Sequence, residues 1–272
     1  MPYSNPQNSP SLNKLLNLKN KSALVVGGSG LLGSEISFVL AELGAKITVA
    51  SRNLKKNKKF IKDLNNKYPN NHSALKVDLK NDKSIKSLFK DYKNQNKSLD
   101  ILVNSGWSGN KNSFESISFT DWENDIDISL NSVFKTIKTF FPLLKKNKGI
   151  ILNISSMYGK IAPDYRIYDG KKYTNPPSYG SAKAGIIQLT KYLSSFLAPH
   201  SIRVNSLSPG PFPYESTQKE NPKFIDKLGK KNTLNRIGFP HEIKGIVAVL
   251  CSEAGSYING QDFSVDGGWT IW

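Results

Sequence analysis

The sequence predicts a single α/β domain in which helices cover both faces of a mainly parallel, seven-stranded sheet. Short runs rich in Val, Ile and Leu recur along the chain with little polar alternation, as is typical of strands buried on both faces. Longer segments with helical spacing separate these runs, and the connections between them are short. Such alternation favours right-handed crossovers. We therefore expect one doubly wound, Rossmann-like domain that binds ligands at the carboxyl ends of its strands.

The apolar runs define seven expected strands, each between four and seven residues long. They are residues 22–27 (SALVVG), 46–51 (KITVAS), 74–77 (ALKV), 99–104 (LDILVN), 149–155 (GIILNIS), 202–208 (IRVNSLS) and 262–266 (DFSVD). Helical patterns occupy about residues 34–43, 54–67, 85–92, 120–145, 178–197 and 240–252. The helix at 54–67 is rich in lysine, and we interpret it as an element with one solvated face.

Residues 1–19 are predicted to form an extension ahead of the domain, because Asn, Pro and Ser are frequent in them. Residues 20–272 then form the domain itself, without an internal repeat. Within it, residues 157–177 are predicted to be an insertion beside the active site. Residues 211–239 are polar and interrupted by Pro, which is typical of a lid over a substrate cleft. Phe212, in this lid, is a candidate substrate contact.

The composition excludes several classes of function. Lys and Arg total 38 against 21 Asp and Glu, a net charge of +17, but these residues are dispersed and no nucleic-acid-binding motif accompanies them. We expect no nucleic-acid partner, and attraction for an anionic small molecule. One cysteine and three scattered histidines argue against a disulfide and a metal site. No run reaches the roughly 18 apolar residues of a membrane span, and the first residues form no secretion signal, so we expect a cytoplasmic protein.

A glycine-rich turn follows the first expected strand and leads into the first helix. Its glycines are Gly27, Gly30 and Gly33, and Ser29 and Leu32 lie between them. Glycines permit a sharp turn and a close approach of the backbone to a diphosphate, while the free N–H groups of the helix start favour an anion. This position between a buried strand and a helix predicts a dinucleotide site.

The end of the second strand bears on the choice of dinucleotide. A carboxylate at this place would bind the ribose hydroxyls of NAD, but the residues are Ser51 and Arg52. The guanidinium of Arg52 can pair with the additional phosphate of NADP. NADP is therefore favoured, with NAD left open. Asp78 and Leu79, after the third strand, are placed to contact the adenine.

A tyrosine and a lysine four residues apart, Tyr179 and Lys183, lie on one face of an expected helix. A phenol with an ordinary pKa near 10 is a poor base at neutral pH, so we expect the neighbouring ammonium, aided by a nicotinamide, to lower the pKa of Tyr179. Ser156 follows the fifth strand, where its hydroxyl can reach a bound carbonyl. Asn131, on the long helix at 120–145, is a candidate for supporting a water chain to Lys183. Such pairs of Tyr and Lys are common by chance, so the assignment depends on this context.

Several motifs, taken in order and spacing, resemble the short-chain dehydrogenase/reductase family over about residues 18–272. They are the glycine turn, VDL (77–79), DILVN (100–104), NISS (153–156), YxxxK (179–183), IRVNSLSPG (202–210) and VDGGW (265–269). The resemblance implies that Ser156 polarises the substrate oxygen, that Tyr179 is the acid/base, and that Lys183 assists it. It also implies that Asn131 is a relay residue.

The same resemblance implies further contacts to the cofactor. They come from Asn104, Ser105, Gly106, Tyr179, Lys183, Pro209 and Gly210. The sequence departs from the family pattern at Leu31 and Trp107, which stand where simple members have glycine. We therefore expect the phosphate loop and the wall near the adenosine ribose to differ. Relatives are commonly homodimers or homotetramers, so we expect a homo-oligomer.

The segment between the expected catalytic serine and tyrosine is unusually long, since 23 positions separate Ser156 from Tyr179. It contains Tyr158, Arg166 and Tyr168, whose aromatic and cationic groups suit a polyhydroxylated or phosphorylated ligand. A surface loop or an oligomer contact is the alternative. This segment and the ending VDGGWTIW resemble a subgroup found with surface-sugar and flagellin-modification genes, which implies a sugar or an activated sugar as substrate.

Three functions remain open from the sequence. The first is an NADP-dependent oxidoreductase that moves hydride between the nicotinamide and a carbonyl or alcohol carbon, with an anionic sugar derivative as the expected substrate. The second is a reductase of 3-oxoacyl thioesters, for which a basic surface would suit an acidic carrier protein. The third is a non-catalytic sensor that binds NADP, although a sensor would not need Asn131, Ser156, Tyr179 and Lys183 together.

Overall fold

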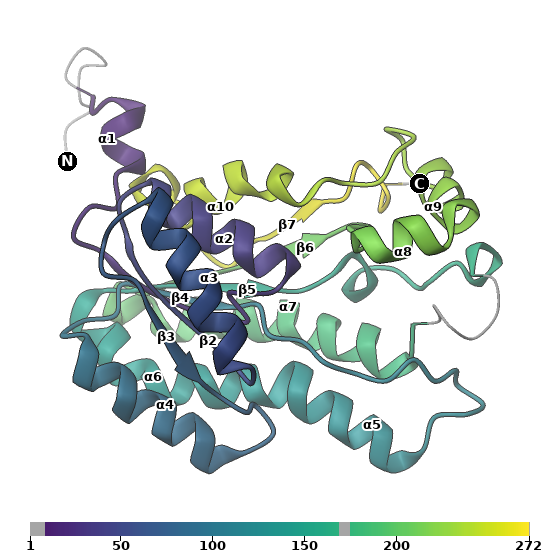
Figure 1. Cartoon of the computed structure of the whole chain (residues 1–272), viewed down its shortest axis with the longest axis horizontal. Coiled ribbons are helices and arrows are strands. Elements are labelled where there is room, and N and C mark those ends of the chain that lie inside the picture. Colours follow the sequence, from purple (N-terminus) through teal and green to yellow (C-terminus); the bar gives the residue numbers. More distant parts are fainter. Residues whose placement is uncertain (1–8, 169–174, 272) are drawn as a thin grey trace.

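The computed structural model describes residues 9–168 and 175–271. A parallel seven-stranded sheet lies between two layers of helices (Figure 1). The strand order is β3-β2-β1-β4-β5-β6-β7, and each neighbouring pair is parallel. The predicted fold class is therefore confirmed. The order reverses between β1 and β4, and such a switch point leaves a crevice at the carboxyl ends of the strands.

The strands agree with the apolar runs of the sequence to within two residues at each end. They are β1 (Ser22–Val26), β2 (Lys46–Ser51), β3 (Ser73–Lys76), β4 (Ile101–Asn104), β5 (Ile150–Ile154), β6 (Arg203–Pro209) and β7 (Asp262–Val265). Successive side chains of a strand point to opposite faces. In β1, Ala23 and Val25 join one hydrophobic core, and Leu24 and Val26 join the other.

The helices cover both faces of the sheet. They are α1 (Leu12–Leu16), α2 (Leu31–Glu42), α3 (Leu54–Lys67), α4 (Asp82–Gln95), α5 (Phe119–Ile126), α6 (Ser132–Asn147), α7 (Pro177–Leu197), α8 (Glu215–Glu220), α9 (Pro222–Lys230) and α10 (Lys244–Leu250). Residues of α2, α3 and α10 form one core with the sheet, and residues of α4, α6 and α7 form the other (Figure 1). Both faces are covered, which explains why the strands lack polar alternation.

Two predicted helices differ from the structure. The helix expected at 120–145 is not continuous, because a π-helical turn at Asp127–Asn131 separates α5 from α6. The helix expected at 240–252 begins as a 3-10 turn at Pro240–Ile243 and continues as α10. A π-turn holds an extra residue, so it rotates the side chains on either side of it relative to a regular helix.

The structure describes part or all of the three segments that the sequence analysis distinguishes within the chain. The extension at 1–19 is described from residue 9, where α1 leads to Leu18, a side chain buried in the core of the domain. The insertion at 157–177 is described except for residues 169–174. The lid at 211–239 contains α8 and α9. Among the described residues, no helix is both long and apolar enough to cross a bilayer.

Candidate active site

A cavity of about 460 Å³ opens at the carboxyl ends of the central strands. Its walls come from the glycine turn, the ends of β2 to β6 and the start of α7, far apart in sequence. Most residues expected at the site line it: Gly27, Ser29, Gly30, Leu32, Gly33, Ser51, Arg52, Asp78, Leu79, Ser105, Gly106, Ser156, Tyr179, Lys183, Pro209, Gly210 and Phe212. The crevice at the switch in strand order is thus the place where these groups meet.

The glycine turn has no room for side chains. Gly27 has a φ of +79°, and a Cβ there would lie 2.7 Å from the carbonyl oxygen of Ser105. A Cβ on Gly33 would lie 2.1 Å from the carbonyl oxygen of Gly27. The backbone therefore forms a tight cradle in front of α2, whose first residues line the cavity and whose first N–H groups have no acceptor within the helix. These residues fit the diphosphate of a dinucleotide.

A buried asparagine that the sequence analysis did not single out supports this cradle. The Oδ1 atom of Asn57 accepts hydrogen bonds from the hydroxyls of Ser29 (2.6 Å) and Ser51 (2.7 Å). Its Nδ2 donates to the carbonyl of Leu75 at 3.0 Å, and the residue is fully buried. Asn57 thus ties the glycine turn to the end of β2. Its place within a lysine-rich helix gave no signal of this role.

The adenosine end of the cavity is basic. Arg52, Asn53, Lys56 and Lys80 line it together with Asp78. Arg52 is exposed and makes no ion pair with any described residue, so its guanidinium is available to a ligand. The end of β2 carries no carboxylate that would repel a phosphate. This arrangement fits a dinucleotide that bears an additional phosphate on its ribose.

The predicted catalytic serine, tyrosine and lysine converge on the same wall. The Nζ atom of Lys183 lies 5.7 Å from the centre of the Tyr179 ring and donates to the carbonyl of Ile154 at 2.8 Å. Both Ser155 and Ser156 line the cavity, but the hydroxyl of Ser155 donates to the carbonyl of Lys183, whereas the hydroxyl of Ser156 bonds to that of Tyr179. A Cβ on Gly159 would lie 2.8 Å from the carbonyl carbon of Lys183. The turn after β5 therefore packs closely against the backbone of α7 at Gly159.

Burial dominates the electrostatics of this wall. It raises the pKa of Tyr179, and the hydroxyl of Ser156 offsets only part of that increase. Burial lowers the pKa of Lys183 to about 8. The sequence predicts that Lys183, aided by a bound nicotinamide, lowers the pKa of Tyr179; in the protein alone that pKa is raised, because desolvation favours the neutral form of both groups. Tyr179 is a protonated phenol at neutral pH, suited to donate a proton.

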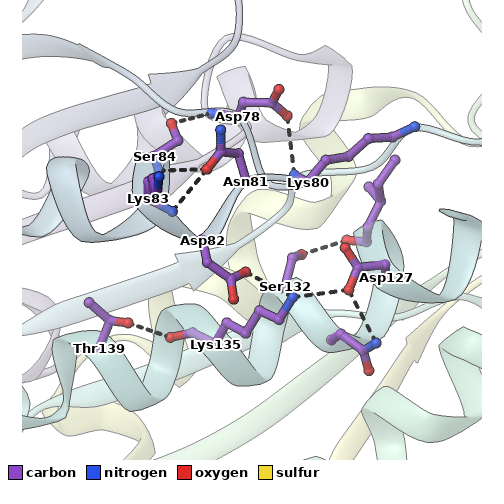
Figure 2. A network of polar contacts seen from close by, with 12 residues as sticks. Asp78, Lys80, Asn81, Asp82, Lys83, Ser84, Asp127, Ser132, Lys135 and Thr139 are labelled. Atoms are coloured by element: carbon purple, nitrogen blue, oxygen red, sulfur yellow. Dashed lines mark hydrogen bonds and ion pairs between the residues drawn. The ribbon is translucent and has the colours of Figure 1, made fainter.

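Asn131 does not join the other catalytic candidates. It is exposed and does not line the cavity, and its Nδ2 donates to Oδ1 of Asp127 at 3.2 Å. Figure 2 shows the network on this side of the helix, where the ammonium of Lys135 reaches both Asp82 (2.9 Å) and Asp127 (3.0 Å). Asn131 is the last residue of the π-turn at Asp127–Asn131. Ile128, at the same turn, lines the cavity instead.

Asn104 lies near the cofactor candidates but does not line the cavity. Its side chain is buried, and its Nδ2 donates to Oδ1 of Asn153 at 2.9 Å. Asn153 in turn donates to the hydroxyl of Thr190 on α7. The side chain of Asn104 therefore belongs to a polar link between β4, β5 and α7, and its contact with the cofactor stays a prediction.

The substrate candidates of the insertion lie outside the cavity. The side chain of Arg166 is 87% exposed and forms two hydrogen bonds with the carboxylate of Asp164. The hydroxyls of Tyr158 and Tyr168 bond to each other, and Tyr168 also accepts from Asn175. Neither tyrosine lines the cavity. Of the four expected substrate residues, only Phe212 lines the cavity.

The insertion instead packs against residues 211–239, the segment that the sequence predicts to be a lid. Its residues Met157, Tyr158 and Ile167 share a hydrophobic cluster with lid residues and Trp269. The rings of Tyr168 and Phe224, on α9, have centroids 5.6 Å apart. Trp107, Ser108 and Tyr214 also line the cavity. Within the described ranges, no group of three His, Cys, Asp or Glu side chains is arranged to hold a metal ion.

Comparison with known sequences places these features in a family. The family model described as enoyl-(acyl carrier protein) reductase matches residues 29–270. The chain is 30% identical over 254 residues to a 3-oxoacyl-(acyl-carrier-protein) reductase, FabG, of Aquifex aeolicus, covering 93% of this chain and 98% of the relative.

Solved structures agree with this similarity. A short-chain dehydrogenase of Leptospira borgpetersenii with bound NAD+ is 32% identical, has a TM-score of 0.81, and is matched over 99% of both chains. A complex of RhlG with NADP from Pseudomonas aeruginosa is 27% identical, has a TM-score of 0.85, and is matched over 94% of this chain and 98% of that one. The fold, the site and the matched sequences agree: the chain belongs to the short-chain dehydrogenase/reductase family of oxidoreductases, which use a nicotinamide cofactor.

Proposed function

We propose that this oxidoreductase transfers hydride between NADP(H) and the carbonyl or alcohol carbon of a compact, polar substrate, a sugar or an activated sugar. The observation that carries the proposal is the convergence of Ser156, Tyr179 and Lys183 on the wall of the cavity that holds the glycine cradle. The bound nicotinamide supplies or accepts the hydride. The protein residues orient the substrate oxygen and exchange its proton.

Each of the three side chains has a distinct role in this proposal. Tyr179, a buried phenol, donates the proton to the oxygen that forms when a carbonyl is reduced, and takes it back in the reverse direction. The hydroxyl of Ser156 hydrogen-bonds the same oxygen and polarises the carbonyl. The ammonium of Lys183, held by Ile154, stabilises the negative charge of the phenolate when Tyr179 has lost its proton.

The preference for NADP over NAD rests on the adenosine end of the cavity. Arg52, Lys56 and Lys80 supply positive charge there, and Arg52 has no ion-pair partner among the described residues. A ribose phosphate would offer Arg52 a charge-assisted pair. The two similar structures contain different dinucleotides, NAD+ in one and NADP in the other, so this preference comes from the chain's own residues.

The size of the substrate is proposed from the substrate end of the cavity. The insertion packs on α9. Three aromatic side chains line the cavity, namely Trp107, Phe212 and Tyr214. An aromatic wall of this kind suits the C–H groups of a sugar ring, and we infer a compact molecule at this end of the cavity. The net charge of +17 favours an anionic derivative.

A second candidate function is the reduction of a 3-oxoacyl thioester. It is favoured by the names of the relatives, since the Aquifex aeolicus protein and seven others with comparable identity are 3-oxoacyl-(acyl-carrier-protein) reductases. The positive charge of the chain would also suit an acidic carrier protein.

A substrate panel separates the two candidates. We would follow the absorbance of NADPH, and of NADH in parallel, with keto-sugars, phosphorylated keto-sugars, nucleotide-linked keto-sugars and acetoacetyl-CoA. The proposal predicts turnover of a keto-sugar with NADPH and little with acetoacetyl-CoA. The reverse ranking would establish the second candidate. Tight NADPH binding without turnover of any compound would indicate the non-catalytic sensor instead.

Self-association is proposed as well, with an interface on α6 and α7. Phe134, Tyr192 and Phe196 are exposed on these helices, and the rings of Tyr192 and Phe196 stack with centroids 5.8 Å apart. Exposed aromatic clusters of this kind mark contact surfaces. Light scattering after size exclusion should give the mass of a dimer or tetramer, and Tyr192→Glu with Phe196→Glu should reduce that mass.

A further inference from the structure

The loop after β4, residues 105–118, places an indole against the predicted acid/base. The rings of Trp107 and Tyr179 have centroids 5.5 Å apart and meet edge to face at 80°. Trp107 lines the cavity, and 43% of its surface stays exposed. The Nζ atom of Lys111, on the same loop, lies 5.1 Å from the centre of the Trp107 ring. Trp107 therefore places a large side chain beside the phenol of Tyr179 at the cavity.

A buried carboxylate joins this loop to the helix that carries Tyr179. Asp125, on α5, is 5% exposed. Its Oδ1 accepts from the backbone N–H of Asn110 (3.3 Å), and its Oδ2 accepts from the side-chain amide of Asn110 (2.6 Å). The Oδ2 atom also accepts from the hydroxyl of Ser178 at 2.7 Å. Ser178 directly precedes Tyr179, so a single carboxylate ties the loop to the start of α7.

The packing between Asp125 and Trp107 is close. A Cβ on Gly109 would lie 3.1 Å from Oδ1 of Asp125 and 3.4 Å from Cζ2 of Trp107. The loop therefore passes between the carboxylate and the indole at a residue without a side chain. Burial lowers the pKa of Lys111, and the charge of Asp125 acts in the opposite direction, which places this carboxylate near the ammonium as well.

We propose that Trp107 is a specificity-determining residue, and that Asp125 is the positioning residue that holds it against Tyr179. This inference rests on the proposed hydride transfer. An indole at this place limits the width of the group attached to the substrate carbon next to Tyr179. It admits a slim substituent, such as a methyl or hydroxymethyl group, and excludes a phenyl group. A buried carboxylate is unfavourable unless hydrogen bonds satisfy it, and those bonds lock the loop in one position.

The test is a double-mutant cycle on substrate preference. The variants are Trp107→Ala, Asp125→Asn and the double variant, and Glu123→Gln is the control. Glu123→Gln removes an exposed carboxylate from the same helix without touching the loop. Each protein is assayed with NADPH on benzil, which has two phenyl groups, and on the compact carbonyl compound that the wild type reduces fastest. The readout is the ratio of the two kcat/KM values, which a general loss of folded protein does not change.

Trp107→Ala should shift this ratio toward benzil by about tenfold or more. Asp125→Asn should shift it in the same direction by a smaller factor, because an NH2 donor replaces one of the two carboxylate oxygens that accept from Asn110 and Ser178. The double variant should equal Trp107→Ala, since Asp125 acts through the indole. Ser178→Ala, which leaves Asp125 and Asn110 paired, should give a partial shift and serves as the second variant where Asp125→Asn folds poorly. Glu123→Gln should leave the ratio unchanged.

Two results would overturn the inference. An unchanged ratio in Trp107→Ala would show that the indole does not select the substrate. Shifts that multiply in the double variant would show that Asp125 acts independently of Trp107. Failure of the proposed function itself is distinguishable, because the wild type would then bind NADPH, as seen by nucleotide fluorescence, but reduce no carbonyl compound; that result also removes the basis of the inference.

Discussion

The ammonium of Lys183 is anchored on the end of β5, where it donates to the carbonyl of Ile154 at 2.8 Å, and it faces the Tyr179 ring at 5.7 Å from its centre. One carbonyl is the only hydrogen-bond acceptor that the described residues give this buried ammonium. Its charge is therefore weakly compensated, and burial lowers its pKa to about 8. Two consequences for pH dependence follow, one for activity and one for stability.

Activity in the direction of carbonyl reduction should fall as the pH rises above about 8, because Lys183 then loses the charge that stabilises the phenolate of Tyr179. The profile of kcat/KM against pH should show a single descending limb near that value. Lys183→Arg keeps its charge throughout the range, so this variant should be slower but should lack the limb. A profile that is flat to pH 10 in the wild type would contradict the role of Lys183.

The same lowered pKa predicts that folding stability depends on pH. The pKa of Lys183 falls from an ordinary 10.5 to about 8 in the native protein, so between these values the unfolded chain binds more protons. The free energy of unfolding should therefore rise with pH in that interval. Relative to Lys183→Met, the wild type should gain about 2 kcal/mol between pH 8 and pH 10. Urea titrations of both proteins at the two pH values measure this difference, and a constant difference would contradict the assignment.

Arg52 should decide the preference between the two dinucleotides. Arg52→Ala removes a guanidinium that has no ion-pair partner among the described residues and lines the adenosine end of the cavity. The KM for NADPH should therefore rise by about ten- to a hundredfold. The KM for NADH should change by less than about threefold, because NADH has no phosphate at that place. Lys55→Ala, a neighbouring cation that does not line the cavity, is the control. Equal effects of Arg52→Ala on both cofactors would refute the proposed phosphate contact.

Asn57 should contribute to cofactor binding although it is buried behind the cavity. Asn57→Ala leaves the hydroxyls of Ser29 and Ser51 without their shared acceptor, so we expect the Kd for NADPH to rise by about tenfold and the melting temperature to fall. Asn65→Ala is the matched control, because Asn65 lies on the same helix and bonds to the backbone of His72 away from the cavity. That variant should lower the melting temperature and leave the Kd unchanged. Identical Kd values for both variants would rule out a positioning role.

The fold and the chemical core of the site could be predicted from the sequence because both depend on local patterns. Apolar runs place the strands, and the glycine turn and the pair Tyr179–Lys183 depend on spacings of a few residues along one element. Their meeting in one cavity follows from the topology, since the carboxyl ends of parallel strands lie at one edge of the sheet. The same reasoning placed Ser156 correctly beside Tyr179.

The errors have physical causes that no local pattern reveals. Asn131 was proposed from its place on the helix expected at 120–145 and from the family resemblance, but it ends the π-turn at Asp127–Asn131 and does not line the cavity. Arg166 was expected to bind substrate, but Asp164, two residues earlier, already pairs with it. Asp125 and Asn57 were missed because their importance comes from contacts with other elements, Asn110 and Ser178 for the first and Ser29 and Ser51 for the second.

The most direct measurement of the central claim is a comparison of wild type and Tyr179→Phe in two assays. One assay follows NADPH absorbance with the best substrate of the panel, and the other follows NADPH binding by its fluorescence. Removing a single hydroxyl from a buried ring should reduce kcat by at least about a thousandfold and leave the Kd for NADPH within about threefold of the wild type. Turnover of Tyr179→Phe within about tenfold of the wild type would contradict the assignment of this phenol as the group that exchanges the substrate proton.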